Sequence, residues 1–184
     1  MLEALVHNQL KNLLQASVCP WPHNLTLSRL VARSLRCRDH SFLQLEVGSH
    51  DFWWLGLLTP LCLQPNDVVL VLSAGLQRHF LQTELPKLNQ QGLNLSCSDG
   101  PKPSSKQKVW LLDHLGLIKA FREGALKSKH LIVPEAEFFI DSLREALALV
   151  ITSEDWEQLR RSHPSVDAKL MKIHIHERYS SHIR

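Results

Sequence analysis

The fold of this chain is read most directly from residues 46–60, Glu46-Val47-Gly48-Ser49-His50-Asp51-Phe52-Trp53-Trp54-Leu55-Gly56-Leu57-Leu58-Thr59-Pro60. An apolar segment that predicts a strand precedes this stretch, and an apolar segment that predicts a helix begins within it. Nucleotide-binding domains place a phosphate loop at this position. Such a loop needs glycines for backbone N–H contacts, a lysine for charge and a Ser or Thr hydroxyl for magnesium. Here Trp53 and Trp54 stand where the lysine and the hydroxyl would be, so the frame of the loop is predicted without its phosphate-binding chemistry.

Working outward, apolar segments that predict strands alternate with segments that predict helices. Strands are expected at residues 41–47, 68–72, 109–112 and 131–133. Residues 68–72 are apolar without interruption, which is typical of a parallel strand buried on both faces. Helices are expected at residues 2–16, 26–35, 53–63, 76–88, 116–126 and 136–151. This order predicts an α/β, three-layer fold with a mainly parallel sheet, in which ligands bind at the carboxyl ends of the strands.

Length and composition favour one domain with an appendage. The chain has 184 residues, of which 44% are hydrophobic, an ordinary share for a globular core. We expect a domain at residues 1–150 and a helical, polar C-terminal extension at residues 151–184. No apolar run approaches the roughly 18 residues that span a bilayer, and the N-terminus does not resemble a signal peptide. These features predict a cytoplasmic protein with no membrane partner.

The cysteines predict reduced thiols without a metal. Cys19, Cys37, Cys62 and Cys97 are widely spaced and none forms a C-x-x-C pair. A disulfide framework, a zinc site and an iron–sulfur cluster all favour closer or repeated spacings. We therefore expect no metal site.

The charge of the chain is uneven. The formal net charge is +3, and the basic excess lies at residues 101–130. Such a surface can contact phosphate backbones, or it can be an ordinary solvated surface. Trp110 is either a stacking residue beside this surface or a buried strand residue. The candidate nucleic-acid contacts are Lys102, Lys106, Lys108, Lys119 and Arg122.

Taken in order, these segments resemble the first RecA-like domain of superfamily 2 DNA helicases of the DinG and XPD type, particularly the DinG-like proteins of cyanobacteria. The family's phosphate loop reads E-A-G-T-G-T-G-K-T, and Glu46, Gly48 and Ser49 fall in register with it. Residues 131–137 are similar to the family's V-I-D-E-A-H segment. In that register Glu135 matches the glutamate that activates water, and Pro134 replaces the aspartate that organises magnesium.

The resemblance implies a P-loop NTPase-like (RecA-like) fold and a degenerate nucleotide site formed by Gly48, Ser49, Trp53 and Trp54. Loss of the lysine and the aspartate removes transition-state stabilisation on the order of 3–7 kcal/mol. We therefore expect nucleic-acid binding without ATP hydrolysis, and no cofactor. ATP and magnesium enter only if the degenerate site still binds them, and Glu135 is the one candidate catalytic residue.

Several alternatives stay open. Glu135 can be an ordinary exposed or ion-paired glutamate, and the two tryptophans can stack on a base or pack in the core. The chain can be a fragment of an active ATP-dependent DNA helicase, or a protein-interaction scaffold with an apolar face at Trp156 and Leu159. The partners that the resemblance implies are single-stranded or duplex DNA and a second helicase domain.

Overall fold

A computed structural model describes residues 2–15, 21–45, 53–63, 68–103, 106–148, 152–166, 168–169 and 171–173. The chain forms two compact units, residues 1–146 and residues 147–184. The first unit holds the sheet and therefore every described residue of the candidate sites.

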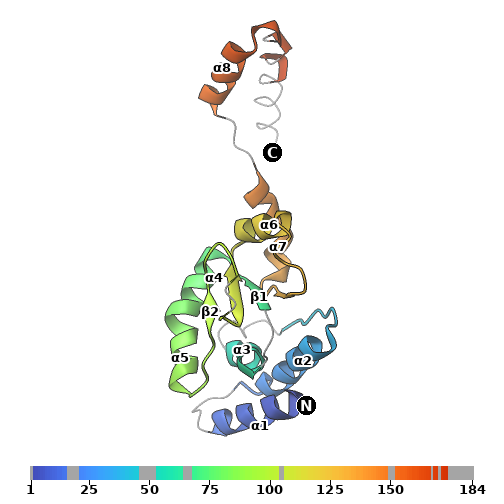
Figure 1. The fold of residues 1–184 in the computed structure, drawn as a ribbon, viewed down its shortest axis with the longest axis vertical. Coiled ribbons are helices and arrows are strands. Elements are labelled where there is room, and N and C mark those ends of the chain that lie inside the picture. Colours follow the sequence, from blue (N-terminus) through green and yellow to red (C-terminus); the bar gives the residue numbers. More distant parts are fainter. Residues whose placement is uncertain are drawn as a thin grey trace. The chain divides into compact units, whose positions relative to one another are not determined.

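In the first unit three helices precede the first strand, and helices then follow β1, β3 and β4; Figure 1 shows most of these elements. The helices are α1 (Leu2–Gln15), α2 (Asn24–Cys37), α3 (Trp54–Leu63), α4 (Ala74–His79), α5 (Leu85–Gln90), α6 (His114–Arg122) and α7 (Ala136–Leu147). A π-helical turn, Phe80–Glu84, joins α4 to α5, so helix continues from Ala74 to Gln90. The strands are β1 (Val68–Val71), β2 (Cys97–Ser98), β3 (Val109–Leu112) and β4 (His130–Ile132).

The four strands form one parallel sheet in the order β2-β3-β1-β4. Val69 of β1 is aligned with Trp110 of β3 and with Leu131 of β4. Parallel strands need crossover connections, and helices supply them between β1 and β2 and between β3 and β4, whereas the described residues between β2 and β3 contain no helix. The α/β class and the parallel sheet predicted from the sequence are confirmed.

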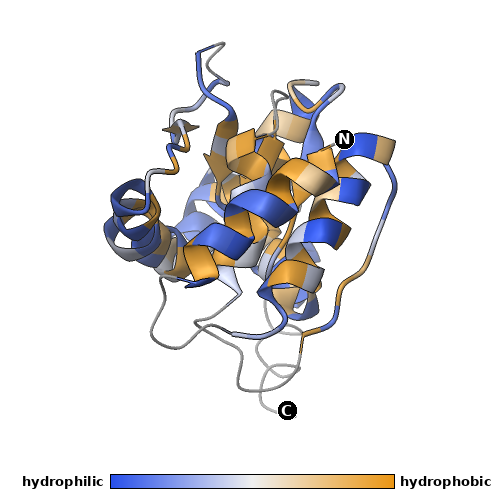
Figure 2. Ribbon diagram, turned by 90° about the horizontal axis from the view of Figure 1, so that it is seen from below, coloured by the Kyte–Doolittle hydropathy of each residue, from blue (hydrophilic) through white to orange (hydrophobic). Residues whose placement is uncertain are grey.

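The two faces of the sheet are covered by different helices, which gives three layers (Figure 1). Val68, Leu70 and Leu72 pack with α2, α3 and the helical run from Ala74 to Gln90. Val69 and Val71 face the other way, toward α6 and α7. This follows from the pleat, which directs successive side chains to opposite faces. Figure 2 shows hydrophobic ribbon gathered at the centre of the domain.

One expected strand is wrong where it is described. Residues 41–45 form no strand, and residues 46 and 47 lie outside the described residues. Burial nevertheless alternates here, because Leu43 and Leu45 pack against the core whereas Phe42 is exposed. The segment instead shares a groove with the first half of α2. Alternating burial therefore arises here from packing against a helix, without a strand ladder.

Two helix starts also differ from the prediction. Helix α2 begins at Asn24 after His23, two residues before the expected start at residue 26. Helix α6 begins at His114, where the Asp113 side chain accepts from the Gly116 N–H group. In the second unit, α8 (Ser153–Ser162) begins with a capping box formed by Thr152 and Asp155.

Candidate functional site

The site at the start of α3 is the place where the sequence predicts a degenerate phosphate loop. The first N–H groups of a helix have no partner inside the helix and can bind an anion. Here the Gly56 N–H group donates to Asn24 Oδ1 at 2.9 Å, and Asn24 is only 3% exposed. Asn24 Nδ2 in turn donates to the Trp21 carbonyl at 3.2 Å. A side chain of α2 therefore occupies a donor of α3 that a phosphate would otherwise use.

The approach of α2 to α3 depends on the absence of a side chain at Gly56. A Cβ atom at this position would lie 2.9 Å from Asn24 Oδ1 and 3.0 Å from the Asn24 carbonyl oxygen. Both distances are shorter than ordinary van der Waals contact. Glycine is thus required by the close packing of the two helices.

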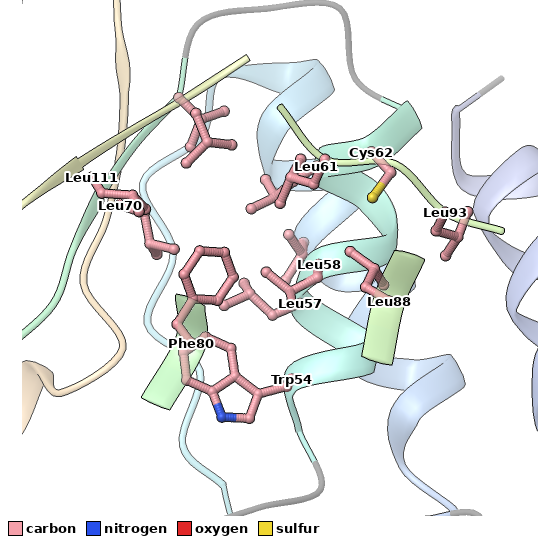
Figure 3. Close-up of a cluster of buried hydrophobic side chains, with 14 of the residues drawn as sticks. Trp54, Leu57, Leu58, Leu61, Cys62, Leu70, Phe80, Leu88, Leu93 and Leu111 are labelled. Atoms are coloured by element: carbon pink, nitrogen blue, oxygen red, sulfur yellow. The ribbon is translucent and has the colours of Figure 1, made fainter. Parts of the chain in front are cut away.

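Trp54 belongs to the core. Its side chain is 1% exposed, and its ring centroid lies 5.6 Å from that of Phe80 and 4.1 Å from that of Trp53. Figure 3 shows the Trp54 indole beside the Phe80 ring among leucines of α3. The prediction that this tryptophan packs in the core is confirmed. Trp53 is partly buried against the same cluster.

These contacts determine which groups lie at the start of α3. Trp54, which the sequence resemblance aligns with the magnesium-binding hydroxyl, is directed into the core together with Phe80. Trp53, which the same resemblance aligns with the lysine, is stacked on it. Gly48 and Ser49, the other two predicted residues of this site, lie outside the described residues. Among the described residues, the start of α3 therefore contains Gly56, whose N–H group is bonded to the Asn24 side chain, and two stacked indoles.

Glu135 lies at the carboxyl-terminal edge of the sheet, as predicted. Its Oε2 atom accepts from the Ser73 N–H group at 3.3 Å, which ties the residues after β4 to those after β1. Ser73 Oγ accepts from the Leu76 N–H group, and Asp113 Oδ1 accepts from the Gly116 N–H group at 2.6 Å. The polar side chains at this edge therefore satisfy backbone donors of the helices that begin there. Glu135 is half-buried and bonded to a backbone N–H group, which differs from the exposed or ion-paired glutamate left open above.

Lysines that flank the strands lie at the opposite edge of the sheet. Lys108 directly precedes β3 and Lys129 directly precedes β4, and both line a shallow recess with Ser98 and Pro103. Because the strands are parallel, this is the amino-terminal edge. The Lys108 ammonium group donates to the Cys62 carbonyl, so it holds the C-terminal turn of α3. Lys108 is thus a structural residue as well as a basic one.

The other candidate nucleic-acid residues are on the surface. Lys102 and Lys106 are exposed in the segment before β3. Lys119 and Arg122 are exposed three residues apart on α6, so they share one face of the helix. Since α6 leaves the carboxyl-terminal edge and the chain returns to start β4, Arg122 lies toward the amino-terminal edge.

The aromatic residue near this basic surface is not the one that the sequence suggested. Trp110 is buried, and its Nε1 atom donates to the Gly100 carbonyl at 2.8 Å. Phe121, which follows Lys119 closely on α6, is 74% exposed. In the sequence Phe121 stands between Ala120 and Arg122, and no pattern there distinguishes it from a buried aromatic residue.

The apolar face proposed at Trp156 and Leu159 needs a correction. Trp156, the buried residue of α8, is only 8% exposed. Only Leu159 is exposed there. An amphipathic helix buries its largest apolar side chain first, so this tryptophan is unavailable to a partner.

Burial changes the acidity of two thiols and one imidazole. It raises the pKa of Cys62 to about 11 and that of Cys97 to about 12. It lowers the pKa of His130, and the nearby Arg38 charge acts in the same direction. Both thiols are therefore protonated at neutral pH and are poor nucleophiles.

Among the described residues, no three His, Cys, Asp or Glu side chains are placed to hold a metal ion. Within the same residues, every helix is too short or too polar to cross a bilayer. No family model, curated protein or solved structure matches the chain.

Proposed function

We propose that this chain is a nucleic-acid-binding module whose first unit derives from a P-loop NTPase-like (RecA-like) domain and no longer hydrolyses ATP. The observation that carries the binding proposal is Phe121, an aromatic ring 74% exposed beside Arg122 and near Lys119. Base–aromatic stacking together with cationic contacts to phosphates is how proteins bind single strands without sequence preference. We expect single-stranded DNA to be the preferred ligand.

The loss of hydrolysis is supported by the start of α3. Hydrolysis needs a lysine and a magnesium-binding group against the phosphates. The register of those groups holds Trp53 and Trp54, which stack on each other, and the Gly56 donor is bonded to Asn24. Glu135 is bonded to a backbone N–H group. We propose that the protein uses neither ATP nor magnesium.

The binding proposal is tested by fluorescence anisotropy with a labelled 20-mer of deoxythymidine and with a 20-bp duplex. Two phosphate contacts, from Lys119 and Arg122, predict a salt slope of about −1.4, so affinity for the single strand should fall about sevenfold between 50 and 200 mM salt. Phe121→Ala and the double variant Lys119→Gln/Arg122→Gln should weaken binding. Arg144→Gln, which removes an exposed charge on α7, is the matched control. Equal binding by all variants would refute the assignment to α6.

The hydrolysis proposal needs a separate assay. Purified protein is incubated with ATP and magnesium, with and without DNA, and phosphate release is measured. We expect no turnover above background. Turnover that disappears in Glu135→Gln would instead establish an active site.

A protein-interaction role is the second candidate, and a specific surface favours it. Leu131 of edge strand β4 and Phe138 and Ile140 of α7 are all exposed apolar residues. Exposed edge strands and apolar side chains are typical of protein contacts. No oligonucleotide binding at 50 mM salt would favour this function over the first.

A further inference from the structure

A groove of about 390 Å³ lies between the first half of α2 and the extended segment at residues 42–45. Its size is within the range of pockets that bind small ligands. Leu27, Leu43 and Leu45 contribute to the core beneath it. The lining residues include these three with Trp21, His23, Thr26, Leu30, Phe42 and Gln44.

Three aromatic rings border the groove. Trp21 and His23 are arranged edge to face, with ring centroids 5.3 Å apart. Phe42 comes from the opposite side and is 77% exposed. Because the Phe42 ring is so exposed, packing in the core does not explain why it lies at this position. These flat surfaces suit a planar ring as ligand, since every nucleobase can stack on an aromatic side chain.

The surroundings of the groove are basic. Residues 4–38 contain Lys11, Arg29, Arg33, Arg36 and Arg38 and no Asp or Glu. Arg36 is paired with Glu3 at 2.7 Å. Arg29 and Arg33 are exposed, and neither forms an ion pair with another described residue.

The helical spacing brings these two arginines to the rim of the groove. Arg29 follows the lining residue Thr26 by three positions, and Arg33 follows the lining residue Leu30 by three. Residues three apart are neighbours on a helix surface. The apolar groove with its aromatic border is therefore edged by positive charge, which is complementary to a phosphate backbone.

We propose that this groove is a second contact for single-stranded nucleic acid, separate from α6. A base packs against Phe42 and the Trp21–His23 pair, and the flanking phosphates lie along Arg29 and Arg33. This proposal rests on the proposed function and names a further site for the same ligand. Charge complementarity favours a nucleic-acid strand over an uncharged apolar peptide.

The test uses the full chain and a labelled 12-mer of deoxythymidine, with anisotropy measured from 25 to 300 mM salt. Phe42→Ala should weaken binding by at least about fivefold, the lower end of what one stacked base contributes. Arg29→Gln/Arg33→Gln should lower the magnitude of the salt slope by about 1.4, which corresponds to two lost phosphate contacts. Arg144→Gln should change neither. Circular dichroism melting establishes that each variant is folded, and exposed Phe42 is expected to be replaceable without unfolding.

Each outcome has a distinct meaning. If the unaltered chain binds no 12-mer at 25 mM salt, both this proposal and the proposed function are refuted. If binding depends on Phe121 and is unchanged by Phe42→Ala and Arg29→Gln/Arg33→Gln, the groove alone is refuted. Polyglutamate is also added as a competitor of the 12-mer. If it competes equally well in Phe42→Ala and in the unaltered chain, the contact is simple charge attraction and base stacking is refuted. Saturable AMP binding that Phe42→Ala abolishes, without any effect of that variant on the 12-mer, would assign the groove to a mononucleotide and overturn the strand proposal.

Discussion

Replacing Gly56 by alanine should destabilise the protein although alanine is the better helix former. In an open helix this exchange stabilises by about 1 kcal/mol. At Gly56 the added Cβ would meet Asn24 Oδ1 at 2.9 Å and the Asn24 carbonyl oxygen at 3.0 Å. Forcing α2 and α3 apart costs about 2 kcal/mol, and loss of the buried hydrogen bond from the Gly56 N–H group costs about 2 kcal/mol more. The net expectation is a loss of about 3 kcal/mol.

The assay is thermal unfolding followed by circular dichroism, with urea unfolding for the free energy. For a chain of this length, about 3 kcal/mol corresponds to a fall in Tm of about 6–12 °C. Gly75→Ala is the matched control, because a Cβ atom at Gly75 meets nothing within 4 Å. It should raise the free energy of unfolding by up to about 1 kcal/mol.

A double variant locates the cause. In an Asn24→Ala background the side-chain oxygen is absent, so Gly56→Ala should cost about 1 kcal/mol or less beyond the first change. The reasoning is refuted if Gly56→Ala is as stable as Gly75→Ala, or if its cost is the same in both backgrounds. The first result would mean that α2 does not close over the start of α3, and the second that the Asn24 side chain is not the cause of the destabilisation.

Other contacts give further expectations. Trp54→Ala should lower the free energy of unfolding by about 3–5 kcal/mol in urea titrations, because the indole is fully buried. Thr152→Ala removes the capping box of α8 and should speed amide hydrogen exchange in that helix, equivalent to about 1 kcal/mol, without affecting α2. At pH 8 about one in a thousand Cys62 thiols or fewer is ionised, and fewer still of Cys97, so iodoacetamide should label exposed Cys37 first. Equal labelling of all three by mass spectrometry would contradict the burial of Cys62 and Cys97.

Local patterns were sufficient for part of the fold and not for the candidate sites. The uninterrupted run at residues 68–72 is recognisable as a buried parallel strand because both its faces are apolar. A strand was also expected at residues 41–47, yet the described residues 41–45 pack beside α2 and pair with no described strand. Burial of every second residue shows which side chains face the core. It does not show whether the backbone is hydrogen-bonded to a neighbouring strand. Trp110 and Phe121 illustrate the same limit, since only packing distinguishes a buried ring from an exposed one.

The amino-acid sequence by itself determined that this is an α/β chain with a parallel sheet, because the hydrophobic periods of strands and helices are properties of short segments. Only the tertiary structure decided what happens at the start of α3. Asn24 reaches the Gly56 N–H group from 32 residues earlier in the chain, and Phe80 meets Trp54 from a helix beyond the first strand. Such contacts depend on how α2, α3 and the Ala74–Gln90 helical run pack together, and no local period encodes a hydrogen bond between distant segments.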